Sequence, residues 1–325
     1  MSITLATFVF TTLTFGIMPA QCSWTPINFR PIIGILSQET SDNITSQYPK
    51  NYSSYIAASY VKFIEGSGAR VAPIWIGKNE SYYEDILGKV NGVLLPDGSS
   101  SFSNKSGYVD AADMIYNISK KINKKGDYFP IFGISLGLQV LTYLEAGRKE
   151  HRINCSSDGQ LISLNFTSAL NSSKMFNKTS PGILHVLNCQ EITGNYHNLC
   201  VTTEGLRNVS VDKEYNVLSI NNDYNGVEFV STLEHDTLPF YGVQFDPVKN
   251  LYEWVKRKNI THTQYAYKVT RYFGDFFISE ARKNMHKFPT KEEAGSLIYN
   301  YTVTYTAPKI GWFLQTYLFN ENDTN

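Results

Sequence analysis

The stretch Tyr128-Phe129-Pro130-Ile131-Phe132-Gly133-Ile134-Ser135-Leu136-Gly137-Leu138-Gln139 decides the fold class of this 325-residue chain. An apolar run leads into Gly-x-Ser-x-Gly, and the residues that follow favour a helix. This is the layout of a nucleophile elbow, where small residues flank the turn because there is almost no room for side chains beside it. The amides at the start of the helix point toward any oxyanion formed there. The stretch therefore predicts a strand, a tight turn and a helix, with Ser135 at the position of a nucleophile.

Apolar runs and helical patterns alternate on both sides of the elbow. We expect strands at 30–36, 71–76, 92–96 and 240–245, and helices at 53–67, 82–89, 108–121 and 263–286. Such alternation is typical of βαβ units and of a parallel sheet covered on both sides. Pro73 favours an edge position or a strand start for the second strand.

Between residues 147 and 240 the pattern changes to short β-like pieces at 161–166, 217–220 and 227–233. We interpret them as antiparallel additions to the same sheet, and no linker separates them from the rest. The sequence predicts an α/β fold with a mostly parallel central sheet and helices on both faces. A single domain is expected over residues 23–325, after a leader at 1–22.

The composition excludes some classes of partner. Lys plus Arg equals Asp plus Glu at 29 each, and no basic or acidic run exceeds a few residues. Nucleic acid and an anionic membrane are therefore not expected as partners. A hydrophobic content of 42% is ample for a packed core.

Residues 1–22 form an uncharged apolar stretch with small residues at its end, which indicates a secretory signal peptide cleaved between Ala20 and Ser23. A signal anchor is the alternative, because the stretch lacks the usual positive residue. Asn-x-Ser/Thr acceptors then recur at Asn43, Asn51, Asn79, Asn104, Asn117, Asn154, Asn165, Asn171, Asn177, Asn208, Asn259, Asn300 and Asn322. Their density together with the leader favours a glycosylated secreted or luminal protein, the alternative being a plain bias toward Asn.

Three cysteines remain after the leader, at Cys155, Cys189 and Cys200. In an oxidising compartment this allows at most one disulfide and one free thiol, unless Cys22 is retained. The pairing stays open, and a structural role is expected because none of them has metal-ligand spacing.

Gly133-x-Ser135-x-Gly137 also matches the elbow of the α/β-hydrolases, which need an acid and then a histidine later in the chain. His262 and His286 come late enough. Neither follows a short apolar strand with an acid before it, and no His-Gly-Gly segment precedes the elbow. This interpretation is therefore the weaker one.

Six separated stretches support another family. They are 30–36, 55–62, 91–96, 126–130, 241–244 and 279–284. Together they resemble the γ-glutamyl hydrolases (peptidase C26), lysosomal or secreted hydrolases of folate polyglutamates with a class I glutamine amidotransferase-like, flavodoxin-like fold. The resemblance covers about residues 29–319. It implies a small-molecule γ-glutamyl ligand, no cofactor and no metal, and it leaves a homodimer open.

The family is one of cysteine hydrolases, with a Gly-x-Cys-x-Gly elbow and a later Gly-Val-Gln-Trp-His-Pro-Glu. On this resemblance Ser135 stands at the nucleophile position, Asp246 at the position of the histidine base and Val248 at that of the glutamate. All three members of the triad would be replaced. A serine hydroxyl needs a base to remove its proton, and a carboxylate at residue 246 is too weak a base for that.

The surroundings of the elbow differ as well. The family reads Pro-Gly-Gly-Ser where this chain has Pro96-Asp97-Gly98-Ser99, which places a carboxylate where negative charge would develop. The resemblance also implies substrate-binding positions at Gly98, Leu136 and His197, the last because Asn195-Tyr196-His197 matches an Asn-Phe-His segment. A packing role for His197 is the alternative.

Two functions follow from the sequence. The first is a γ-glutamyl hydrolase-like protein, secreted or lysosomal, that is catalytically inactive and keeps a ligand-binding cleft. The second is an active hydrolase that cleaves γ-glutamyl bonds of folate polyglutamates with Ser135, using an unrecognised base such as His197.

Overall fold

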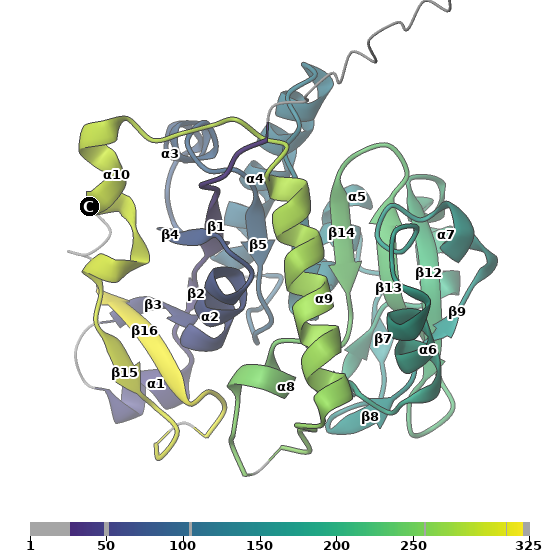
Figure 1. Cartoon of the computed structure of the whole chain (residues 1–325). Coiled ribbons are helices and arrows are strands. Elements are labelled where there is room, and N and C mark those ends of the chain that lie inside the picture. The colour runs from purple at the N-terminus through teal and green to yellow at the C-terminus, as the bar shows by residue number, and fades with distance from the viewer. Residues whose placement is uncertain (1–26, 49–51, 104–105, 257, 310, 321–325) are drawn as a thin grey trace, which may run out of the picture.

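The computed structural model describes residues 27–48, 52–103, 106–256, 258–309 and 311–320 (Figure 1). The leader expected at 1–22 lies outside these residues, as do the sequons at Asn51, Asn104 and Asn322.

An eight-stranded sheet forms the centre of the molecule, in the order β4-β1-β5-β6-β14-β13-β12-β9 (Figure 1). In that order the strands are Arg70–Ile74, Ile32–Leu36, Val93–Leu95, Ile131–Ile134, Phe240–Val243, Glu228–His235, Tyr215–Asn222 and Asn165–Phe166. The first five are parallel to their neighbours, and the last three pair in antiparallel fashion. The mostly parallel sheet is confirmed, and β4, which carries Pro73, lies at its edge as expected.

Helices cover both faces of this sheet. Helices α3 (Glu80–Leu87), α4 (Tyr108–Lys124) and α5 (Leu136–Glu145) pack on one face, and α2 (Ala58–Gly66) and α9 (Gln264–Ala281) pack on the other. The side chains of β1 alternate between the two apolar clusters, with Ile32 and Leu36 in the first and Ile33 and Ile35 in the second. An unbroken apolar strand is what burial on both faces requires.

A second sheet of four strands, in the order β15-β16-β3-β2, lies beside the parallel edge (Figure 1). Its strands are Val303–Tyr305, Gln315–Asn320, Tyr52–Ala57 and Gln38–Glu39, and the short helix α1 (Asp42–Gln47) precedes β3. The expected helix at 53–67 is therefore wrong in its first five residues. Apolar residues there suit a helix or a strand, and pairing with the distant strand β16 decides for the strand.

The remaining elements surround the antiparallel half and the C-terminal end. They are α6 (Pro181–Cys189), α7 (Thr203–Asn208), α8 (Lys249–Tyr252), α10 (Thr290–Ser296) and the pairs β7 (Ile153–Asn154) with β11 (Leu199–Cys200) and β8 (Gln160–Ile162) with β10 (Thr193–Asn195). Of the piece expected at 161–166, only β9 joins the main sheet. Across the described ranges, no helix is long and apolar enough to cross a membrane.

The elbow has the predicted geometry. Ser135 joins β6 to α5 with φ 51° and ψ −102°, a strained backbone conformation for a residue other than glycine. A Cβ on Gly133 would lie 2.6 Å from the carbonyl carbon of Gly137, and a Cβ on Gly137 would lie 2.1 Å from the carbonyl oxygen of Leu95. The two glycines allow α5 to begin against β5 and β6, so the elbow depends on them whatever chemistry it supports.

We expect Gly137→Ala to lower the free energy of unfolding by about 3 kcal/mol or more, because its new methyl group meets backbone atoms that cannot rotate away. Gly295→Ala in α10 is the matched control, since nothing lies within 4 Å of the added Cβ. Helix propensity makes this control neutral or stabilising by up to about 1 kcal/mol. Urea denaturation measures both, and equal stabilities of the two variants would contradict the packing described for the elbow.

Candidate active-site pocket

The elbow lies at the floor of a pocket of about 520 Å³ at the carboxyl ends of the parallel strands, the usual ligand position in such sheets. Its lining comes from the elbow, the loop after β5, the segment 196–199, α1 and the C-terminal sheet. The lining residues that matter below are Asn43, Asp97, Gly98, Ser135, Leu136, Arg152, Tyr196, His197, Lys249, Lys258 and Trp312.

A buried lysine joins two carboxylates beside Ser135. The Lys249 ammonium lies 2.9 Å from Asp97 Oδ2 and forms a second ion pair with Asp246 Oδ2. Tyr60 donates its hydroxyl hydrogen to the same oxygen of Asp246 at 2.7 Å. The exposed fractions of the side chains are 6% for Lys249, 14% for Asp97 and 1% for Asp246. We call Asp97, Lys249 and Asp246 the ion network.

The charges within the ion network shift the pKa values of Lys249 and Asp97. Burial alone would lower the pKa of Lys249, but the charges of Asp246 and Asp97 and the hydrogen bonds to them raise that pKa above its ordinary value. Burial alone would raise the pKa of Asp97, but the Lys249 charge and its hydrogen bond hold that pKa below the ordinary value. At neutral pH Lys249 is therefore charged and Asp97 is a carboxylate.

Asp97 also contacts the start of α5. Interactions with the Ser135 hydroxyl and the Leu136 backbone N–H further lower the pKa of Asp97. The Leu136 amide belongs to the first residue of α5, so it is the donor that an elbow offers to an oxyanion. Gln38 fixes the loop by donating to the Asp97 carbonyl at 2.8 Å, and a Cβ on Gly98 would lie 1.6 Å from Gln38 Oε1. Gly98 and Leu136 line the pocket, and the Asp97 carboxylate contacts the Leu136 amide.

Val248 does not face this chemistry. Its side chain is fully buried and belongs to the apolar cluster that includes Ala266, Val269 and Phe273 of α9. A valine at this position packs into the core and offers no polar atom to a partner at residue 246.

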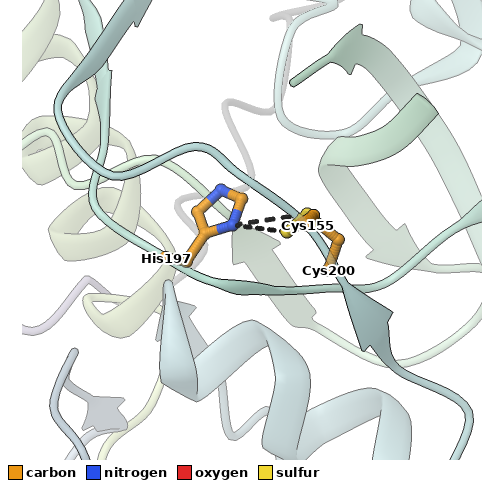
Figure 2. Close-up of side chains that lie close together, drawn as sticks. All are labelled: Cys155, His197 and Cys200. Atoms are coloured by element: carbon orange, nitrogen blue, oxygen red, sulfur yellow. Dashed lines mark hydrogen bonds between the residues drawn. A yellow bond between two sulfur atoms is a disulfide. The ribbon is translucent and has the colours of Figure 1, made fainter. Parts of the chain in front are cut away.

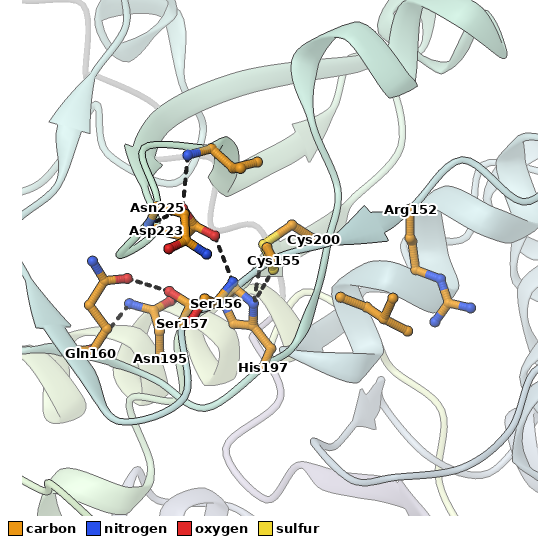
Figure 3. Close-up of a disulfide and its surroundings, with 12 residues drawn as sticks. Arg152, Cys155, Ser156, Ser157, Gln160, Asn195, His197, Cys200, Asp223 and Asn225 are labelled. Carbon is orange, nitrogen blue, oxygen red and sulfur yellow. Dashed lines mark hydrogen bonds between the residues drawn. A yellow bond between two sulfur atoms is a disulfide. The ribbon is translucent and has the colours of Figure 1, made fainter.

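His197 lines the pocket, but its ring nitrogens face other groups than Ser135. Nε2 lies 3.2 Å from Asn195 Oδ1. Nδ1 lies 3.4 Å from the sulfur of Cys200 (Figure 2). Burial lowers the pKa of His197 to about 4, so the ring is neutral at pH 7. The surrounding loops are tied together, with the Asp223 carboxylate accepting from the Ser156 amide at 2.6 Å (Figure 3). These contacts fit the packing role better than that of a base.

Cys155 and Cys200 form a disulfide beside this histidine (Figure 2). Cys189 is a free, exposed thiol. The expected count of one disulfide and one free thiol agrees with this. The sulfurs and a nitrogen of His197 lie within 4.8 Å of one another, as in a metal site. Metal binding needs thiolates, and here both sulfurs are in the disulfide, so the group does not fit a metal ion.

The two histidines of the α/β-hydrolase alternative lie elsewhere. His262 stacks on Trp254, and its Nδ1 faces the Asn250 carbonyl oxygen at 2.9 Å. The Nδ1 of His286 faces the Leu87 carbonyl oxygen at 2.7 Å. Neither histidine is among the residues that line the pocket around Ser135, so the alternative loses its base.

The sequence reasoning missed the cations of the pocket. Lys249 lies three residues after Asp246 and is the first residue of α8, so the spacing could have suggested the ion pair. Arg152 donates to Gln139 Oε1 at 3.1 Å, and Lys258 lies 4.4 Å from the ring centre of Trp312. These contacts join residues far apart in sequence, and no local pattern signals them.

Comparison with known proteins supplies the family. The family model described as peptidase C26 matches residues 31–248. The chain belongs to the peptidase C26 family. Proteins named γ-glutamyl hydrolase are similar to it over nearly their whole length: that of Rattus norvegicus is 39% identical and that of Homo sapiens 37%, each over 293 residues and 90% of both chains. The γ-glutamyl hydrolase B of Dictyostelium discoideum is 35% identical over 301 residues, which cover 92% of this chain and 86% of that one.

Solved structures of low sequence identity are also similar. A glutamine amidotransferase of Methylobacillus flagellatus is 9% identical with a TM-score of 0.41, over 80% of this chain and 97% of that one. The membership in the peptidase C26 family confirms the resemblance found in the sequence, and the doubly covered, mostly parallel sheet agrees with the fold expected from it.

We expect Lys249→Met to lower the free energy of unfolding of this peptidase C26 protein by about 3–5 kcal/mol, because two buried carboxylates lose their shared cation. Lys121→Met is the control, since the Lys121–Glu80 pair is exposed, and it should change the stability little. Urea denaturation at pH 7 measures both.

The pH dependence of the stability shows whether lost charge pairing or lost packing destabilises Lys249→Met. In the wild type the lowered pKa of Asp97 gives stability that is present above the unfolded pKa, near 4, and is lost only as pH falls through the lower folded value. In Lys249→Met the two carboxylates without their cation take up protons more readily. The difference in the free energy of unfolding between wild type and variant should therefore decrease from pH 7 toward pH 4. A gap that stays constant over this range would mean that lost packing, and not charge, explains the effect.

Proposed function

We propose that this member of the peptidase C26 family does not hydrolyse γ-glutamyl bonds and binds a small γ-glutamyl ligand in the pocket. The observation that carries the proposal is the ion network, which places a carboxylate against the Leu136 amide and a lysine-paired aspartate at residue 246. On the resemblance, these are the places of the oxyanion and of the base. The position of the nucleophile would be held by Ser135.

The chemistry of hydrolysis fails at two steps in this arrangement. A tetrahedral intermediate would bring a second negative charge to an amide that Asp97 already contacts. Asp97 and Asp246 are paired with Lys249, and the lowered pKa of Asp97 makes it a poor acceptor for the Ser135 proton. Loss of triad function leaves at most about 10³ to 10⁴ over the uncatalysed rate, and that remainder needs a working oxyanion hole.

The alternative, an active hydrolase that uses Ser135, requires a base within reach of its hydroxyl. His197 is neutral and could accept a proton, but its ring nitrogens face Asn195 and the disulfide. The contacts at the pocket therefore favour the inactive protein.

Binding is supported by the composition of the pocket wall. Arg152 and Lys258 line the wall as cations, paired with Glu150 and Asp158 respectively, and Tyr196 and Trp312 supply aromatic faces. A pocket of about 520 Å³ with apolar walls and a few cations suits a small ligand with carboxylates. We propose no nucleic acid or membrane partner, and a homodimer stays open.

We also propose that the protein is a secreted or lysosomal glycoprotein. Thirteen sequon asparagines occur in the chain, three of them outside the described residues, and the other ten are all exposed. The Cys155–Cys200 disulfide fits an oxidising compartment. The leader at 1–22 is the sequence feature that would direct the chain there.

Glutamate release tests the proposed inactivity. The secreted protein and its Ser135→Ala variant would be incubated with a γ-Glu-Glu dipeptide and with a folate polyglutamate, and free glutamate would be measured. We expect no release above the buffer rate from either protein, and ligand binding by calorimetry. Turnover by the wild type that Ser135→Ala abolishes would establish the active hydrolase instead.

A combined substitution at the pocket then distinguishes two causes of inactivity, the loss of the catalytic residues and a change in the rest of the pocket. Ser135→Cys, Asp246→His, Val248→Glu and Asp97→Gly would be combined, which restores the family pattern at each position. Recovered hydrolysis would show that these residues suppress the reaction. An inactive variant that folds and still binds the dipeptide would place the cause outside these four positions.

A further inference from the structure

One glycosylation sequon lies on the wall of the pocket itself. Asn43, followed by Ile44 and Thr45, is an exposed residue of α1 and lines the pocket together with Ser41. Of the ten sequon asparagines in the described part of the chain, Asn43 is the one that lines this pocket.

The backbone of Asn43 is held in place by its neighbours. The Ser41 hydroxyl oxygen accepts from the Ile44 amide at 3.4 Å and caps α1. The Ile44 side chain is buried in a small apolar cluster with Tyr55 and Leu318. Anything attached to Asn43 is therefore anchored to the pocket wall through α1.

We propose that an N-linked oligosaccharide on Asn43 lies across the pocket mouth and limits the size of the ligands that reach Ser135. An N-glycan is bulky and hydrophilic, and its first sugar would be bonded directly to Asn43, which lines the pocket. The inference rests on the proposed function only in so far as the pocket binds a ligand.

The attachment is an ordinary glycosyl transfer with a polyprenyl-diphosphate oligosaccharide as the donor. The Nδ2–C1 bond forms as the C1–O bond to the leaving diphosphate breaks, and Nδ2 gives up one proton. Thr45 supplies the hydroxyl that the sequon requires.

A pair of variants isolates the glycan. Thr45→Ser keeps the sequon and Thr45→Ala removes it, and residue 45 is exposed. Each would carry Ser135→Cys as a reporter thiol at the pocket floor and Cys189→Ser to remove the exposed thiol. Proteins secreted from glycosylating cells would be mapped by mass spectrometry for occupancy of Asn43. Alkylation of the residue-135 peptide by iodoacetamide and by a bulky dye maleimide would then be timed.

We expect the ratio of the maleimide rate to the iodoacetamide rate to be severalfold higher in Thr45→Ala than in Thr45→Ser. The ratio cancels any change in the reactivity of the thiol itself. Thr302→Ala, which removes the exposed sequon at Asn300, should leave the ratio unchanged. Enzymatic removal of the glycan from folded Thr45→Ser should reproduce the Thr45→Ala ratio.

An unoccupied Asn43 in Thr45→Ser, or equal ratios with an occupied Asn43, would overturn the inference. Failure of the proposed function appears separately, as glutamate release or as missing heat of binding, and neither result alters the alkylation ratio.

Discussion

The ion network of Asp97, Lys249 and Asp246 is the interaction on which the interpretation of this pocket depends. A buried ammonium and two buried carboxylates are costly to remove from water, and each is tolerated because the others are present. Such a group resists partial change, since the loss of one member leaves the rest uncompensated.

The elbow survives beside this network because its requirements are geometric. Gly133 and Gly137 permit a close approach of β5, β6 and α5, and that approach holds α5 against the sheet. The same packing serves a folded protein with or without a reactive side chain at residue 135. A motif typical of hydrolases can therefore persist beside the ion network.

The sequence predicted what depends on local pattern. The strand, turn and helix around Ser135 and the antiparallel strands β12 and β13 follow from periodicity and small residues. The edge position of Pro73 follows from the backbone N–H that proline lacks. It mispredicted residues 53–57, where pairing with β16 overrides the local pattern, and it gave no sign of the four-stranded sheet. The sequence identified two members of the ion network, because Asp97 and Asp246 depart from the family pattern. It did not show that Asp97 pairs with Lys249, since these residues are far apart in the chain and meet only when it folds.

The central claim is that Ser135 is not an activated nucleophile, and its reaction with a serine-directed fluorophosphonate tests this most directly. The folded protein would be treated at pH 7, digested, and the residue-135 peptide examined by mass spectrometry, with Ser135→Ala as the blank. The ion network predicts an unmodified peptide after prolonged exposure, because Asp97 is a poor acceptor for the Ser135 proton and the ring nitrogens of His197 face other groups. Stoichiometric phosphonylation of Ser135 that urea unfolding abolishes would contradict the account.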